Sequence, residues 1–164
     1  RLFALNAIVI ASKAGGRDLI LRRDLPLEPD QAWAWITESG KTGQWFGTWT
    51  GAGEAGGEIE VTMVAEEGNP KSAMKINACE PGRSYEVTGS DESGGWNLEL
   101  KLEEGEGGTR LTFIHHLGEE DKVEMIGPGW EFYLDHLLAA IEGNEKKDFS
   151  EYWPAMGPYY AELG

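Results

Sequence analysis

The 164-residue sequence has few of the residues that build disulfides, metal sites and membrane spans. Its single cysteine, Cys79, excludes an intramolecular disulfide and a sulfur-rich metal site, and is typical of a protein kept in the reducing cytoplasm. No apolar run approaches the ~18 residues that a membrane-spanning helix needs. The three histidines and one cysteine form no pattern of metal ligands, so we expect no bound metal.

Positive charge is also scarce. The chain has 14 Lys and Arg against 29 Asp and Glu, for a formal net charge of −15. Such a field repels nucleic acid and anionic membrane surfaces, so neither is expected as a partner. The acidic surface is compatible with contact to a basic patch on another protein, and equally with a role in solubility alone.

Signatures of nucleophilic and phosphate chemistry are missing as well. No serine stands in a Gly-x-Ser-x-Gly turn, and Cys79 has no evident histidine partner. The glycine cluster GAGEAGG (51–57) lacks the preceding strand and following helix of a phosphate loop, and Glu54 and Glu58 would repel a phosphate. We therefore expect no catalytic constellation and no cofactor.

Apolar and polar residues alternate from Gly57 onward. Five alternating segments, separated by turn-rich breaks, predict an antiparallel meander with one buried and one solvated face. Before them, residues 1–17 are expected to form a strand and a turn that lead into a second strand, RDLILRRDL. The inward positions of the meander include Ile59, Val61, Met63, Met74, Ile76, Tyr85, Val87, Trp96, Leu98, Leu100, Leu111, Phe113 and His115.

Two further regions have helical spacing. EPDQAWAWITESG (28–40) predicts a short helix, and a second turn or brief helix follows at 41–45. GPGWEFYLDHLLAAIEG (127–143) predicts a long helix, with Pro128 in its first turn and Gly143 at its end. The apolar stripe of this helix comprises Trp130, Tyr133, Leu134, Leu137, Leu138 and Ile141, with Glu131, Asp135 and Glu142 on its flank.

The order of these elements predicts one α+β domain over residues 1–164, in which the long helix covers the apolar face of the sheet. Phe132 and His136 lie opposite the apolar stripe, and a large aromatic residue is not expected to face water there. Either an ordered tail (144–164), with Phe149, Tyr152 and Trp153, covers them, or a second subunit does, as in a homodimer.

The adjacent His115 and His116 point to opposite faces of a strand, so they cannot share one metal. The register places His115 inward and His116 outward. His115 is interpreted either as a titratable group at a cavity mouth or as a hydrogen-bonded histidine at a strand end. His136 is expected at the surface or an interface.

A bent sheet around one helix is not always filled by side chains, and the remaining cavity is where a small apolar ligand would lie. Methionine and aromatic side chains adapt to varied apolar ligands, although the same residues also fill solid cores. The candidate cavity residues are Trp45, Met63, Met74, Ile76, Trp96, Leu98, Phe113, His115, Trp130 and Leu134.

Five segments are specific when taken together: PDQAWAWIT (29–37), GQWFG (43–47), GGEIEVTM (56–63), GGTRLTFIHHL (107–117) and GPGWEFYLDHLLAAIEG (127–143). On these segments the chain resembles the START-like (SRPBCC, helix-grip) superfamily, and within it the branch related to the activator of the 90-kDa heat-shock protein ATPase. The resemblance implies a helix-grip fold, in which a curved antiparallel sheet wraps around a long C-terminal helix and two short helices follow the first strands.

The resemblance implies a fold rather than a reaction, since members of the superfamily bind lipids, sterols, polyketides and hormones, and some cyclise or hydroxylate. The preferred interpretation is a module that binds a hydrophobic or aromatic small molecule between sheet and helix. One alternative is a chaperone ATPase regulator. The full eukaryotic activators add an N-terminal domain that contacts the chaperone, and we do not expect such a domain within these 164 residues, which counts against that role. The other alternative is a cyclase- or hydrolase-type enzyme with His115 as acid or base.

Overall fold

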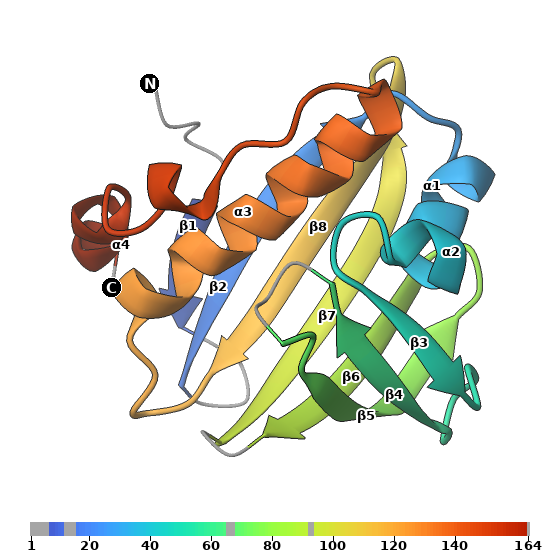
Figure 1. Ribbon diagram of the computed structural model, residues 1–164, viewed down its shortest axis with the longest axis horizontal. Coiled ribbons are helices and arrows are strands. Elements are labelled where there is room, and N and C mark those ends of the chain that lie inside the picture. The colour runs from blue at the N-terminus through green and yellow to red at the C-terminus, as the bar shows by residue number, and fades with distance from the viewer. Residues whose placement is uncertain (1–6, 12–15, 65–67, 92–93, 164) are drawn as a thin grey trace.

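The sheet follows the alternating apolar segments of the sequence. The computed structural model describes residues 7–11, 16–64, 68–91 and 94–163. Within them, eight antiparallel strands pair in the order β1-β2-β8-β7-β6-β5-β4-β3 (Figure 1). These strands are β1 (Ala7–Ala11), β2 (Arg17–Leu25), β3 (Gly47–Gly51), β4 (Glu58–Met63), β5 (Lys71–Glu80), β6 (Ser84–Asp91), β7 (Gly94–Gly105) and β8 (Gly108–Leu117).

The concave face of the sheet carries the apolar rows that the sequence predicts. His115 on β8 pairs with Leu19 on β2 and with Leu98 on β7, and all three are buried. The register of β5 against β6 shifts between Ile76 and Ala78, and such a bulge increases the local bend of a sheet. The predicted α+β helix-grip fold is confirmed.

The long helix α3 (Val123–Glu142) lies on the concave face beside β2 and β8 (Figure 1). Its Leu134 and Leu137 are at most 1% exposed. Gly143 ends the helix in the left-handed conformation (φ 71°), as the sequence predicts. The predicted start at Gly127 is wrong, because the buried Val123 opens the helix one turn earlier and Pro128 is an interior residue.

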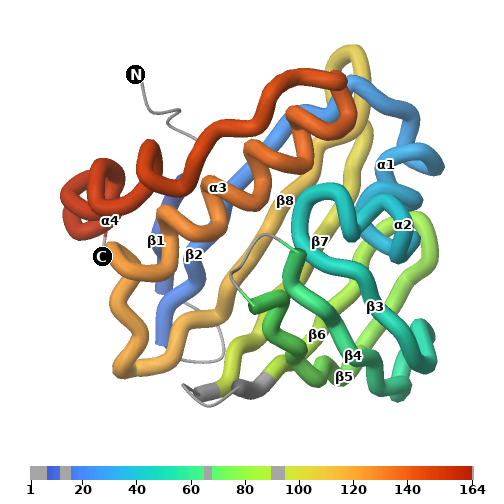
Figure 2. Tube along the Cα trace, in the orientation of Figure 1, coloured from blue at the N-terminus to red at the C-terminus, as the bar shows by residue number. Residues whose placement is uncertain are grey.

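Three short helices and one 3-10 turn complete the fold. They are α1 (Pro29–Thr37), α2 (Ser39–Thr42), η1 (Phe149–Glu151) and α4 (Gly157–Leu163). The first two follow β2, as expected, and lie over one end of the sheet (Figure 2). The edge strand β3, five residues that begin and end with glycine, was not predicted from the sequence.

The C-terminal tail runs back along the outer side of α3 (Figures 1 and 2). The Phe132 ring packs against Phe149 at 5.3 Å and against Tyr152 at 5.7 Å between centroids. His136 Nε2 lies 2.9 Å from the carbonyl oxygen of Lys147. The tail therefore covers Phe132 and His136, which is one of the two predicted covers, and His136 lies at an interface with the tail and not at the surface.

An ion pair beneath α3 also anchors the tail. Arg23, on the inner face of β2, is paired with Glu131 of α3, and both side chains are almost fully buried. The Tyr160 hydroxyl donates to Glu131 Oε1 at 2.6 Å, and the Tyr152 hydroxyl donates to Asp135 Oδ2 at 2.6 Å. Two of the three carboxylates predicted on the flank of the helix, Glu131 and Asp135, thus tie sheet, helix and tail together.

Candidate ligand-binding cavity

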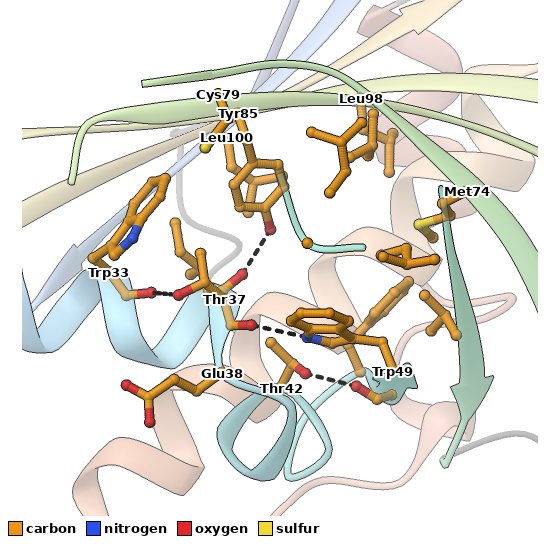
Figure 3. Close-up of a pocket in the computed structure, with 18 of the residues that line it drawn as sticks. Trp33, Thr37, Glu38, Thr42, Trp49, Met74, Cys79, Tyr85, Leu98 and Leu100 are labelled. Atoms are coloured by element: carbon orange, nitrogen blue, oxygen red, sulfur yellow. Dashed lines mark hydrogen bonds between the residues drawn. The ribbon is translucent and has the colours of Figure 1, made fainter. Parts of the chain in front are cut away.

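A cavity of about 400 Å³ lies between the short helices and the β3–β7 half of the sheet (Figure 3). Trp33 and Ile36 of α1 face it from one side, and Leu98 and Leu100 of β7 face it from the other. Phe113 of β8 and Trp130 of α3 line the end nearest the long helix. The cavity opens where three of its lining residues are exposed at the surface: Glu38, Gly53 and Pro81.

The cavity wall is fixed by three hydrogen bonds to the end of α1. The last carbonyl groups of a helix have no partner within it and need another donor. The Trp45 indole N–H donates to the Trp35 carbonyl at 2.9 Å, and the Tyr85 hydroxyl donates to the Ile36 carbonyl at 2.9 Å. The Trp49 indole N–H donates to the next carbonyl, that of Thr37, at 2.8 Å (Figure 3).

The threonine hydroxyl groups of the wall also donate hydrogen bonds to backbone carbonyl groups. Thr37 Oγ1 donates to the Trp33 carbonyl at 2.6 Å, and Thr42 Oγ1 donates to the Gly47 carbonyl at 2.7 Å. In the described part of the chain, the buried side-chain polar atoms without a partner belong to Ser72, Asn97 and His115, and none of these residues lines the cavity. The interior therefore offers a ligand aromatic faces, sulfur atoms and aliphatic groups.

Tyr85 stays a neutral phenol at physiological pH. Burial raises the pKa of its hydroxyl above the usual range, and the neighbouring Cys79, its cross-strand partner, adds to the effect. The carboxylate of Glu38 points away from the aromatic side chains (Figure 3). The cavity is thus apolar and, apart from its rim, without formal charge.

Six of the ten candidate residues line this cavity: Trp45, Met74, Ile76, Leu98, Phe113 and Trp130. Trp96 does not reach it, because its ring lies on Gly89, where an added Cβ would stand 2.6 Å from Trp96 Cε2. Met63, at the end of β4, and Leu134, one turn beyond Trp130, are buried in the core outside the cavity.

His115 also lies outside the cavity, behind Trp130. Its Nδ1 accepts the indole N–H of Trp130 at 3.0 Å, so it is a hydrogen-bonded core histidine and not a group at the mouth. Burial lowers the pKa of His115 to about 4, although Asp121 opposes the shift. The ring is therefore neutral at physiological pH.

His116 points outward, as predicted, and lies between two carboxylates. Its Nδ1 is 2.6 Å from Asp18 Oδ1 and its Nε2 is 2.7 Å from Glu99 Oε1. Partial burial would lower the pKa of His116, but the hydrogen bonds with Asp18 and Glu99 outweigh burial and raise it. This arrangement links β2, β8 and β7 on the face away from the cavity.

The part of the wall that the short helices and β3 supply was not predicted from the sequence. The apolar spacing of α1 was recognised, but not the surface that α1 covers. Trp49 was missed together with its strand, and Tyr85 was assigned only to the buried face of the sheet. The lining residues outside the predicted set include Trp33, Ile36, Thr37, Thr42 and Trp49 from the short helices and β3, and Ile59, Val61, Cys79, Tyr85, Val87 and Leu100 from β4–β7.

The described residues include no cluster of metal ligands and no helix suited to crossing a membrane. No group of three or more His, Cys, Asp or Glu side chains there is arranged to hold a metal ion. None of the helices described has the length and apolar character needed to cross a membrane.

The sequence matches the model of one protein family over residues 26–142. That family is described as Activator of Hsp90 ATPase homolog 1-like protein. No curated protein is significantly similar in sequence.

The fold recurs in solved structures. CalU16 from Micromonospora echinospora is 26% identical, with a TM-score of 0.77 over 96% of this chain and 94% of its own. DynU16, a protein of the dynemicin biosynthetic locus, is 19% identical, with a TM-score of 0.68 over 80% of this chain and 50% of its own. The Aha1 dimer from Colwellia psychrerythraea is 18% identical, with a TM-score of 0.63 over 76% of this chain and 96% of its own.

Proposed function

Because the chain belongs to the Activator of Hsp90 ATPase homolog 1-like family and contains an apolar cavity, we propose that it binds a hydrophobic small molecule there. The proposal depends on one observation above all. The indole and hydroxyl donors of Trp45, Trp49 and Tyr85 are bound to the backbone of α1, which leaves their ring faces for a ligand. Aromatic faces bind flat aromatic molecules by stacking and edge contacts.

Charge narrows the class of ligand further. An anionic group would be desolvated in the cavity without a partner and would meet the field of a chain with formal net charge −15. We therefore propose a neutral ligand with an aromatic part that enters the cavity. The proposal includes no reaction and no cofactor. His115, the candidate acid or base of the enzyme interpretation, is separated from the cavity by Trp130.

The test uses naphthalene as a neutral probe and 2-naphthoate as its anionic counterpart, with binding followed by tryptophan fluorescence. Naphthalene is expected to bind at one saturable site and 2-naphthoate more weakly. Val87→Phe, which places a ring in the cavity, should abolish binding. The matched control is Thr88→Phe, because Thr88 is the next residue on β6 and faces the other side of the sheet. Equal binding by the two variants would contradict the proposal.

The family match also supports a second candidate function, regulation of a chaperone ATPase. The acidic surface would then contact a basic patch, so the effect on ATPase rate should weaken as salt rises. ATPase assays of an Hsp90-type chaperone at low and high salt test this. An unchanged rate at low salt would exclude it.

A further inference from the structure

We propose that Trp130 sets the length of the ligand that the cavity accepts, and that His115 is the positioning residue that holds the Trp130 indole in place. This inference rests on the proposed function, because it concerns how far a ligand can extend inside the same cavity. It assigns a role in specificity to a side chain of α3 and to a histidine that no ligand touches.

The indole of Trp130 stands between the cavity and a second group of side chains. On the cavity side, its ring lies 4.5 Å from Phe113 and 6.0 Å from Phe46 between centroids, and both of these residues line the cavity. On the other side, it lies 6.3 Å from Trp96 and 6.1 Å from His115, and neither of these reaches the cavity. The indole is thus the boundary between the two groups.

His115 fixes this boundary through one directed contact. Its Nδ1 accepts the indole N–H at 3.0 Å, which requires an unprotonated Nδ1. The proton of the neutral ring then resides on Nε2, which is buried and has no partner in the described part of the chain. His115 is therefore buried among apolar residues although its Nε2 has no hydrogen-bond partner there. Its other ring nitrogen, Nδ1, is engaged by Trp130.

Widening the cavity should affect the binding of a long ligand differently at its two ends. At the mouth, a long ligand can already extend past Gly53 and Pro81 into solvent, so widening that end gives little new contact. At the other end, the ligand meets the half-buried indole of Trp130, and removing the indole would let it extend toward Trp96 and His115. Trp49 supplies the matched comparison, because its ring packs beside the exposed Gly53.

The experiment compares two neutral probes, naphthalene and the longer 1,6-diphenylhexatriene, on the full chain. Trp130→Ala is expected to shift the ratio of their dissociation constants about tenfold or more toward diphenylhexatriene, as for a pocket enlarged by several methylene equivalents. Trp49→Ala removes the same side chain near the mouth and should leave the ratio close to that of the wild type. Equal shifts in the two variants would overturn the proposal.

The role of His115 is tested by a pair of substitutions. His115→Leu removes the acceptor and should shift the ratio in the same direction as Trp130→Ala, by a smaller factor. His115→Asn keeps an acceptor near the position of Nδ1 and should restore the wild-type ratio. If His115 contributed only to stability, His115→Leu and His115→Asn would have the same ratio of dissociation constants for the two probes. Identical ratios in His115→Leu and wild type would overturn the positioning role.

A second variant at Trp130 and the binding of the wild type separate the remaining outcomes. If Trp130→Ala does not fold by near-ultraviolet circular dichroism, Trp130→Phe replaces it. That variant keeps a ring but loses the N–H, and it should match His115→Leu; a wild-type ratio would overturn the proposal. If wild-type protein binds naphthalene but Trp130→Ala shifts nothing, only this inference fails. If the wild type binds neither probe, the proposed function fails as well.

Discussion

The hydroxyl of Tyr85 on β6 donates a hydrogen bond of 2.9 Å to the backbone carbonyl of Ile36 in α1, and both residues line the cavity. The bond connects the short helix α1 to the sheet. It also supplies a donor for a carbonyl at the helix end that has no partner within the helix. Together with the bonds from Trp45 and Trp49, it keeps α1 over the cavity without filling the space below.

Tyr85→Phe should lower the free energy of unfolding by about 1 kcal/mol, because it leaves the buried Ile36 carbonyl without its donor. The ring itself stays, so the aromatic wall is kept. Urea unfolding at neutral pH measures the difference, with naphthalene binding as the second readout. Unchanged stability would show that water satisfies the carbonyl and that the bond does not hold α1 in place.

Gly53→Ala should weaken naphthalene binding. An added Cβ would stand 2.5 Å from Trp49 Cη2, so the indole must move into the cavity or lose its bond to Thr37. The control is Gly40→Ala, because a Cβ at Gly40 meets nothing within 4 Å and the residue lies in α2. This control should be stabilised by about 0.5–1 kcal/mol and keep its affinity. Equal affinities in both variants would contradict the role assigned to Trp49.

His116 should make stability depend on pH in a defined direction. Hydrogen bonds with Asp18 and Glu99 raise its pKa above the ordinary 6.5, so the folded state holds the proton more tightly than the unfolded chain. The stabilisation is complete below pH 6.5 and is lost as the pH rises through the folded pKa.

The difference in unfolding free energy between wild type and His116→Asn should therefore be largest near pH 5.5 and shrink toward pH 9. Urea unfolding across this range measures it, and the variant subtracts the contributions of all other titrating groups. A difference that grows with pH would contradict the raised pKa.

Glu131→Gln should be more destabilising than Tyr160→Phe, although the two residues share a hydrogen bond. The first change leaves the buried Arg23 without its main counter-charge, which costs about 3–5 kcal/mol for a buried pair. We expect the lower end of this range, because the partly exposed Asp135 still lies 3.3 Å from Arg23 and offsets part of its charge. The second change removes one bond to a charged acceptor, about 1.5–3 kcal/mol. Thermal unfolding of both variants gives the order, and the reverse order would show that the tail contact dominates.

The fold could be predicted because its information is local. Alternation in β4–β8 and the apolar stripe of α3 depend on residues within one segment. The start of α3 could not be predicted in the same way. Pro128 suggested a first turn, but burial of Val123 extends the helix by another turn.

The site was predicted only in part because it depends on contacts between distant segments. The sequence indicated which residues face inward, but not that α1 and α2 would leave the space beside β3–β7 unfilled. Likewise, nothing local to Arg23 or Glu131 announces their pairing, since 108 residues separate them. His115 has an inward register that was predicted correctly, whereas the indole that separates it from the cavity comes from another element.

The engagement of Trp45, Trp49 and Tyr85 with the end of α1 has a consequence for selectivity between related compounds. Because these three donors are occupied, they cannot compensate a ligand hydroxyl that loses its hydration on entry, and an uncompensated hydroxyl costs roughly 1–3 kcal/mol in proteins. The protein should therefore distinguish a parent aromatic compound from its oxygenated derivative, and retain the less oxidised of the two.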